Sequence, residues 1–104
     1  MKSIKDFRAS LESHIPPKDF DKPGFRALWL AAKGEWEPAH LLVRTCEDKD
    51  GCAWLHAHLH RIEGDSSNAN YWYKRAGIKA YNGDIATELE EIAKLMIKST
   101  NLKE

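Results

Sequence analysis

Residues 52–77 read CAWLHAHLHRIEGDSSNANYWYKRAG, a stretch with the pattern of two short helices joined by a tight turn. The apolar residues of the first helix share one face: Cys52, Leu55, Leu59 and Ile62. Spacings of three and four residues are those of a helix that packs on one side. Gly64 is suited to end this helix, and Asp65 or Ser66 to cap the next one. We therefore expect a helical hairpin over residues 51–77.

The turn of this hairpin has a counterpart thirty residues earlier in the chain. Residues 34–39, GEWEPA, align with residues 64–69, GDSSNA. In both segments a Gly-acid pair precedes an alanine, whose small side chain allows two helices to approach closely. A repeat with a period of about 20 to 50 residues is typical of stacked helix pairs, which form binding surfaces more often than active sites.

Helical periodicity extends through the rest of the chain, and alternating strand patterns are rare. Ser3 and Asp6 are spaced like a capping pair at the start of a helix. The last segment carries Ile85, Leu89, Ile92 and Met96 on one face. We expect a single all-α domain over residues 1–104 with about six helices: an N-terminal helix over 3–14, an extended loop over 15–22, stacked hairpins over 23–46 and 51–77, and a capping helix over 84–99 that covers the open apolar end of the stack.

The second hairpin resembles the tetratricopeptide repeat and its Sel1-like relative. The matching positions are the small residues Ala57, Ala69 and Ala76, the turn Gly64-Asp65 and the aromatic Tyr73. The first hairpin matches through Ala27, Gly34, Trp36, Ala39 and Cys46, so the resemblance covers about residues 23–77. It implies a surface for a peptide or protein, lined by the first helix of each hairpin. The run HAHLHRIEGD with the later YWY is also similar to uncharacterised small bacterial proteins, which implies no activity.

The charges of the chain are balanced, with 16 Lys plus Arg against 16 Asp plus Glu, and both signs are interspersed. Because phosphate backbones require clustered positive charge, we expect no nucleic-acid partner. The longest apolar run, residues 27–32, is too short for a membrane span or a signal-peptide core. We therefore expect a cytoplasmic protein in which Cys46 and Cys52 are reduced thiols packed within helices.

One face of residues 54–61 carries a candidate binding site made of Trp54, His58 and Arg61. An indole offers a large apolar contact, a guanidinium binds a carboxylate through two hydrogen bonds, and an imidazole adds a donor. We expect these residues to bind an acidic or C-terminal segment of a peptide or protein, which would make the chain a small interaction module. The structural alternative is that Trp54 packs against the N-terminal segment while His58 and Arg61 are solvated.

A second pattern is compatible with a metal site. His56 and His60 are one helical turn apart, Glu63 follows three residues later, and His40 lies on the neighbouring helix. These residue types at these spacings can ligate a divalent transition metal. A metal-dependent enzyme or sensor that uses His40, His56, His60 and Glu63 is therefore an alternative function.

The sequence favours structural histidines over this alternative. Ala57 stands where the familiar zinc-hydrolase pattern has its catalytic glutamate. The favoured interpretation has no cofactor, and the histidines hydrogen-bond to the backbone or to Glu63, Tyr71 and Tyr73. No Gly-x-Ser-x-Gly elbow is present either, so we expect a binding protein and not an enzyme.

Two further expectations concern the surface. The carboxylates Glu88, Glu90 and Glu91 are placed on the solvated face of the last helix, where Glu90 can pair with Lys94. A third possible function is a self-associating structural protein, in which exposed Tyr71 and Trp72 form the interface of a homodimer.

Overall fold

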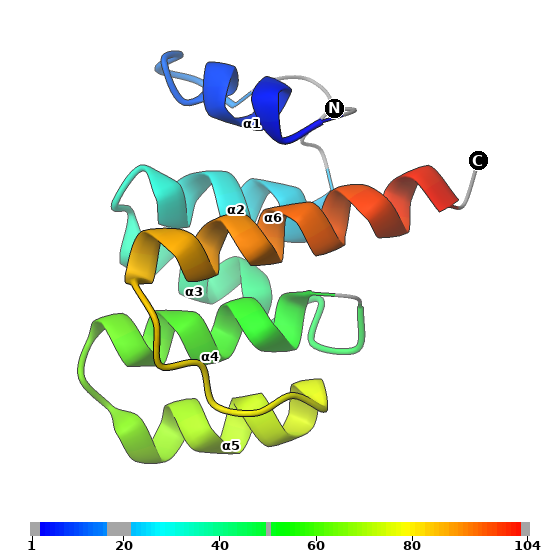
Figure 1. Cartoon of the computed structure of the whole chain (residues 1–104). Coiled ribbons are helices and arrows are strands. Elements are labelled where there is room, and N and C mark those ends of the chain that lie inside the picture. The colour runs from blue at the N-terminus through cyan, green and yellow to red at the C-terminus, as the bar shows by residue number, and fades with distance from the viewer. Residues whose placement is uncertain (1–2, 17–21, 50, 103–104) are drawn as a thin grey trace.

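The computed structural model describes residues 3–16, 22–49 and 51–102. These residues form six α-helices and no strand: α1 (Ile4–Ser10), α2 (Pro23–Ala32), α3 (Trp36–Val43), α4 (Cys52–Ile62), α5 (Ser66–Ala76) and α6 (Ile85–Leu102) (Figure 1). The prediction of an all-α fold with six helices is confirmed. Part of the loop expected over residues 15–22 lies outside the described residues.

The helices are arranged as two hairpins with α6 lying across them. α2 packs against α3 and α4 packs against α5, while α3 and α4 join the two pairs. α6 contacts α2 and α4, and α1 packs on α6 from the other side (Figure 1). As a result, α4 has neighbours on three sides, which explains why most of its side chains are buried. None of the described helices has the length and apolar character needed to cross a membrane.

The two hairpin turns have the same hydrogen-bond pattern. The amide of Glu35 donates to the carbonyl of Leu30 at 2.9 Å, and the amide of Asp65 donates to the carbonyl of His60 at 2.9 Å. Gly34 and Gly64 adopt φ values of 81° and 85°, a left-handed conformation that favours glycine. The alanines that follow, Ala39 and Ala69, are buried where the paired helices meet.

The main core lies between α2, α4 and α6. Its largest fully buried apolar side chains are Leu28, Leu55, Leu59, Ile92 and Val43. α1 is attached to this core by the buried Phe7, and the indole of Trp29 donates to the carbonyl of Ser10 at 3.1 Å. α1 ends at Ser10, four residues before the predicted end at residue 14, and α6 continues to Leu102, beyond the predicted 99.

The expectation of reduced cysteines within helices is wrong. α3 ends at Val43, so Cys46 lies in the turn that follows it and not in the helix. Cys46 forms a disulfide with Cys52, the first residue of α4, over a Cα–Cα distance of 5.8 Å. The chain reverses direction between α3 and α4, and this reversal brings the two thiols together. The prediction failed because it relied on an expected compartment and not on local geometry.

Candidate metal centre

Three histidines come together where α3 packs against α4. His56 and His60 lie one turn apart on α4, so their rings project from the same side of the helix. His40 lies on α3, which contacts α4 directly. The ring nitrogens that could act as ligands all lie within 4.8 Å of one another. Three of the four residues that the sequence grouped as candidate metal ligands are therefore neighbours in the fold; we refer to them as the histidine trio.

The spacing of the trio is close to that of a coordination site. The ring centroids are 4.9 Å apart for His40 and His56, 5.2 Å for His40 and His60, and 4.9 Å for His56 and His60. Zinc–nitrogen bonds of about 2.0–2.1 Å in a tetrahedral site place ligand nitrogens about 3.4 Å apart. The ring of His40 meets those of His56 and His60 edge to face, at interplanar angles of 79° and 74°, while the latter two rings stack on each other at 26°. The side chains therefore have to rotate before the three ligand nitrogens point at one ion.

Two members of the trio have a carboxylate beside the ring nitrogen that would not bind the metal. Nδ1 of His60 donates to Oε1 of Glu63 at 2.5 Å. Nδ1 of His56 is 3.4 Å from Oε1 of Glu47, a contact that falls short of a hydrogen bond. A carboxylate that accepts from Nδ1 leaves Nε2 as the ligand atom and orients the ring, which is the usual arrangement around protein-bound zinc.

Glu63 was predicted as a possible ligand, and the structure places it behind His60. With His60 and Asp65 it forms a second group of potential ligand atoms. Asp65, however, is the N-cap of α5 and already accepts from the amide of Asn68 at 3.1 Å. The hydrogen bond from His60 suits Glu63 to orient the ring of that histidine, and not to bind the metal itself.

The electrostatic environment keeps two of the imidazoles unprotonated. Burial, followed by the proximity of His40, His60 and Arg44, lowers the pKa of His56 to about 3. Burial also lowers the pKa of His40, with further contributions from His60 and Arg44. Because a metal binds the neutral imidazole, no proton has to be removed from these two rings at neutral pH.

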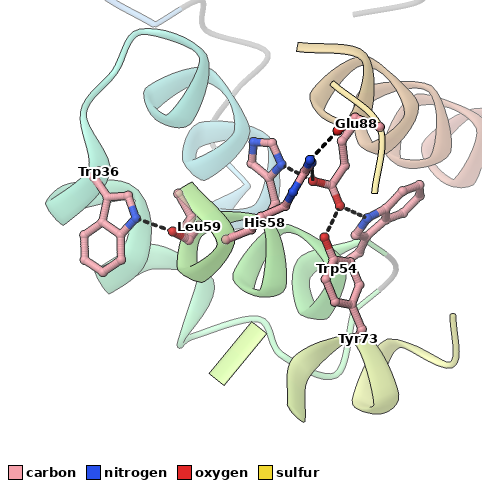
Figure 2. A network of polar contacts seen from close by, with 8 residues as sticks. Trp36, Trp54, His58, Leu59, Tyr73 and Glu88 are labelled. Atoms are coloured by element: carbon pink, nitrogen blue, oxygen red, sulfur yellow. Dashed lines mark hydrogen bonds and ion pairs between the residues drawn. The ribbon is translucent and has the colours of Figure 1, made fainter. Parts of the chain in front are cut away.

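Aromatic side chains enclose the trio. The ring of Trp36 stacks on His40 with a centroid distance of 4.7 Å, and the ring of Trp72 stacks on His56 at 4.0 Å. The indole of Trp36 donates to the carbonyl of Leu59 at 2.6 Å, which holds Trp36 against α4 (Figure 2). His56 and His60 are 4% and 7% exposed, so the trio is dry on the α4 side and reaches solvent beside the half-buried His40.

The expected hydrogen bonds of the histidines are present only in part. His60 bonds to Glu63, as the structural interpretation requires. Nδ1 of His56 has no hydrogen-bond partner among the described residues. Tyr73 donates to a residue of α6, and Tyr71 is 52% exposed. A buried polar atom without a partner is costly, but Nε2 of His58, outside the trio, is a second such atom, so the unpartnered Nδ1 shows only that the expected hydrogen bond of His56 is absent.

The other predicted site, Trp54, His58 and Arg61, also forms a cluster, and Glu88 of α6 occupies its centre (Figure 2). Trp54 Nε1 donates to Oε2 of Glu88 at 2.9 Å, and His58 Nδ1 lies 2.7 Å from Oε1. Arg61 Nη1 donates to the same Oε1 at 3.0 Å. The acidic group that we expected from a partner is thus supplied by the chain itself.

The expectation that Glu88 is solvated is wrong. Its side chain is fully buried, and the hydroxyl of Tyr73 is its fourth donor. Burial alone raises the pKa of Glu88, but the hydrogen bonds from His58, Tyr73 and Trp54 together outweigh burial, so the pKa lies below its usual value. The same burial and hydrogen bond raise the pKa of Tyr73. The neighbouring Glu90 is paired with Arg8 of α1, at 2.6 Å from Nε.

The pair proposed for self-association is divided between surface and site. Tyr71 is exposed, whereas Trp72 is half-buried because it stacks on His56. Trp72 therefore belongs to the wall of the trio.

Comparison of the chain with family models, with curated proteins and with solved structures finds no match. The function has to be argued from the geometry alone.

Proposed function

We propose that this protein binds a divalent transition metal through His40, His56 and His60. The observation that carries the proposal is the convergence of three imidazoles from two helices, with ligand atoms within 4.8 Å of one another. Burial and the neighbouring rings also favour the neutral form of His40 and His56, which is the form that binds a metal.

The donor set indicates the class of metal. Three neutral nitrogen ligands suit zinc, copper and nickel, whereas calcium and magnesium prefer oxygen ligands. Glu47 and Glu63 add negative charge next to the rings, which offsets the charge of a bound dication and of the nearby Arg44. Three protein ligands leave one position of a tetrahedral ion for water or for a small ligand, as in zinc sites that act on substrates.

The proposal is tested by titrating the full-length chain, purified without a histidine tag and stripped of metal, with Zn²⁺ in a calorimeter. We expect one ion per chain for the wild type and loss of binding in His40→Ala. His40 is half-buried on α3, so this variant leaves the α4 core intact. His14→Ala is the matched control, because His14 is exposed and follows α1. Equal binding by wild type and His40→Ala would refute the proposal.

Peptide or protein binding by Trp54, His58 and Arg61 stays a prediction. A partner carboxylate would have to displace Glu88 from four donors, and Arg61→Ala is the variant that tests such binding. A cytoplasmic location and a helical-repeat ancestry also stay predictions. The disulfide between Cys46 and Cys52 argues against permanent residence in a reducing compartment, where such bonds are rare.

A further inference from the structure

The disulfide lies in the connection between the two helices that carry the histidine trio. Cys46 follows the end of α3, the helix of His40, and Cys52 begins α4, the helix of His56 and His60. The bond therefore ties α3 to α4 at one end of the proposed metal site.

The two cysteines also precede two residues that touch each other. Glu47 is the residue after Cys46, and His56 lies one helical turn after Cys52. Oε1 of Glu47 lies 3.4 Å from Nδ1 of His56 without hydrogen-bonding to it, and no described residue hydrogen-bonds to that nitrogen. The position of Glu47 relative to His56 thus depends on a chain segment whose ends are joined by the disulfide.

We infer that the Cys46–Cys52 disulfide regulates the metal site: the oxidised protein holds Glu47 against His56 and binds the metal more tightly than the reduced protein. The inference rests on the proposed metal-binding function. Glu47 is a positioning residue in this scheme, since it acts on the metal only through the imidazole of His56. Reduction frees the connection between α3 and α4, and the ordering of Glu47 then costs conformational entropy that the disulfide otherwise removes.

The reductant is a small dithiol. Its thiolate attacks one sulfur of the protein disulfide and releases the other, and its second thiol then displaces the first protein sulfur. Two electrons and two protons pass to the protein, which gains two thiols, while the reductant leaves as a cyclic disulfide. Cys46 and Cys52 line a cavity of about 350 Å³ bordered by Lys22, Thr45 and Lys49. Both cysteines are buried, so the reductant has to reach them through this cavity, and the positive charge of its lysines favours the thiolate that leaves the disulfide.

The first test measures Zn²⁺ affinity by competition with a chromophoric chelator. The oxidised wild type is compared with Cys46→Ala/Cys52→Ala, which represents the protein without the bond and needs no metal-binding reductant in the assay. Loss of an outer partner of a ligand histidine typically lowers metal affinity by about 10- to 100-fold, so we expect the double variant to bind about tenfold more weakly or worse. Equal affinities would overturn the inference and leave the metal site standing, whereas absence of binding in both proteins would overturn the metal site itself.

The second test uses Glu47→Gln, which keeps the disulfide and so avoids any loss of the covalent link. We expect its affinity to fall to that of the double cysteine variant, and we expect removal of the disulfide from Glu47→Gln to cause no further loss. Glu63→Gln is the matched control. It lowers affinity through His60 but lies outside the disulfide-closed segment, so it should preserve the difference between the proteins with and without the bond. If Glu47→Gln and removal of the disulfide each lowered Zn²⁺ affinity, and the combined variant showed the product of the two losses, Glu47 would not transmit the effect of the disulfide to the metal site. Circular dichroism of each variant checks that the helices are retained.

Discussion

Glu88 and His58 lie thirty residues apart in sequence, and their side chains meet at 2.7 Å in the interior of the protein. Both are almost completely inaccessible to solvent. This pair is the centre of a network that joins α4, α5 and α6, because Trp54 and Arg61 of α4 and Tyr73 of α5 donate to the same carboxylate (Figure 2). The carboxylate bound by Trp54, His58 and Arg61 is therefore one that the chain itself supplies.

Glu88→Gln is expected to destabilise the protein by about 3 kcal/mol, since it removes one charge of a buried ion pair and leaves Arg61 without its counter-charge. Urea unfolding followed by circular dichroism measures the loss. Glu90→Gln is the control on the same helix, and its loss should be much smaller because the Arg8–Glu90 pair is exposed to solvent. Equal losses in the two variants would contradict a central role for Glu88.

The protein is expected to lose stability in acid through Glu88. Its folded pKa lies below the usual 4.5, because the hydrogen bonds to the ionised form outweigh burial. Between these two values the unfolded chain binds more protons than the folded one, so the free energy of unfolding falls as the pH is lowered. The stabilisation from Glu88 is complete above about pH 4.5 and disappears as the pH falls through the folded pKa.

Urea unfolding across this range should show a shallower acid slope below about pH 4.5 for Glu88→Gln than for the wild type. Both proteins should also show a decrease in the free energy of unfolding that begins near pH 6.5, because His56 has a folded pKa of about 3 and an ordinary pKa of 6.5. The unfolded chain takes up the His56 proton first, which again lowers stability as the pH falls. If the free energy of unfolding fell equally steeply in both proteins below about pH 4.5, Glu88 would be excluded as the cause of that loss.

Gly34→Ala and Gly64→Ala are expected to cost similar free energies of about 1 kcal/mol each, since both residues have a left-handed backbone and an added Cβ meets no atom within 4 Å. Gly51→Ala should cost more. Its φ is 87°, and the new Cβ would lie 2.7 Å from Cγ of Met96. Thermal unfolding of the three variants tests this order, and a Gly51→Ala protein as stable as Gly64→Ala would contradict the packing of α6 at this point.

Loss of the disulfide in Cys46→Ala/Cys52→Ala is expected to lower stability by about 2 kcal/mol, because a bond across a sequence separation of 6 restricts only a short loop in the unfolded chain. Urea unfolding without reductant measures the difference. A much larger loss would mean that the connection between α3 and α4 contributes to folding beyond its effect on the unfolded state.

Copper binding to the trio is expected to quench tryptophan fluorescence. Trp36 and Trp72 stack directly on His40 and His56, so a Cu²⁺ ion bound there lies next to two indoles. Trp72→Phe should reduce the fluorescence intensity that is lost when copper is added. Trp54→Phe, which removes an indole bound to Glu88, should leave that loss unchanged. Quenching that is unchanged in Trp36→Phe and in Trp72→Phe would place the copper elsewhere.

Local pattern was sufficient to predict six helices and the turns of both hairpins, although the ends of α1, α3 and α6 differ from the prediction. The spacing of apolar residues predicted the hairpin of α4 and α5, and Gly64 with Asp65 predicted its turn. The i to i+4 spacing of His56 and His60 likewise predicted that their rings would be neighbours. These features depend on residues close in sequence, where helix geometry determines which side chains meet.

The burial of Glu88 was missed although its position carries a signal. Ile92 and Met96 follow it at intervals of four, and both are buried, so Glu88 lies on the inner face of α6. Charged residues are rarely buried alone, and for that reason a glutamate is assigned to the surface. Its burial depends on hydrogen-bond donors from α4 and α5. These donors are far from Glu88 in sequence, so the spacing of residues within α6 cannot predict them. The contact of Glu47 with His56 was missed for a related reason, since it joins the turn after α3 to α4.

Glu88, whose carboxylate accepts hydrogen bonds from the side chains of α4, is synthesised after α4 itself. When a ribosome has produced the second hairpin, Trp54, His58 and Arg61 have all been made, and Glu88 is still to come. A nascent chain at this stage presents a basic, aromatic strip whose donors have not yet received the carboxylate that they bind in the finished protein. The second hairpin therefore reaches its final packing only after α6 has been synthesised and has docked against α4.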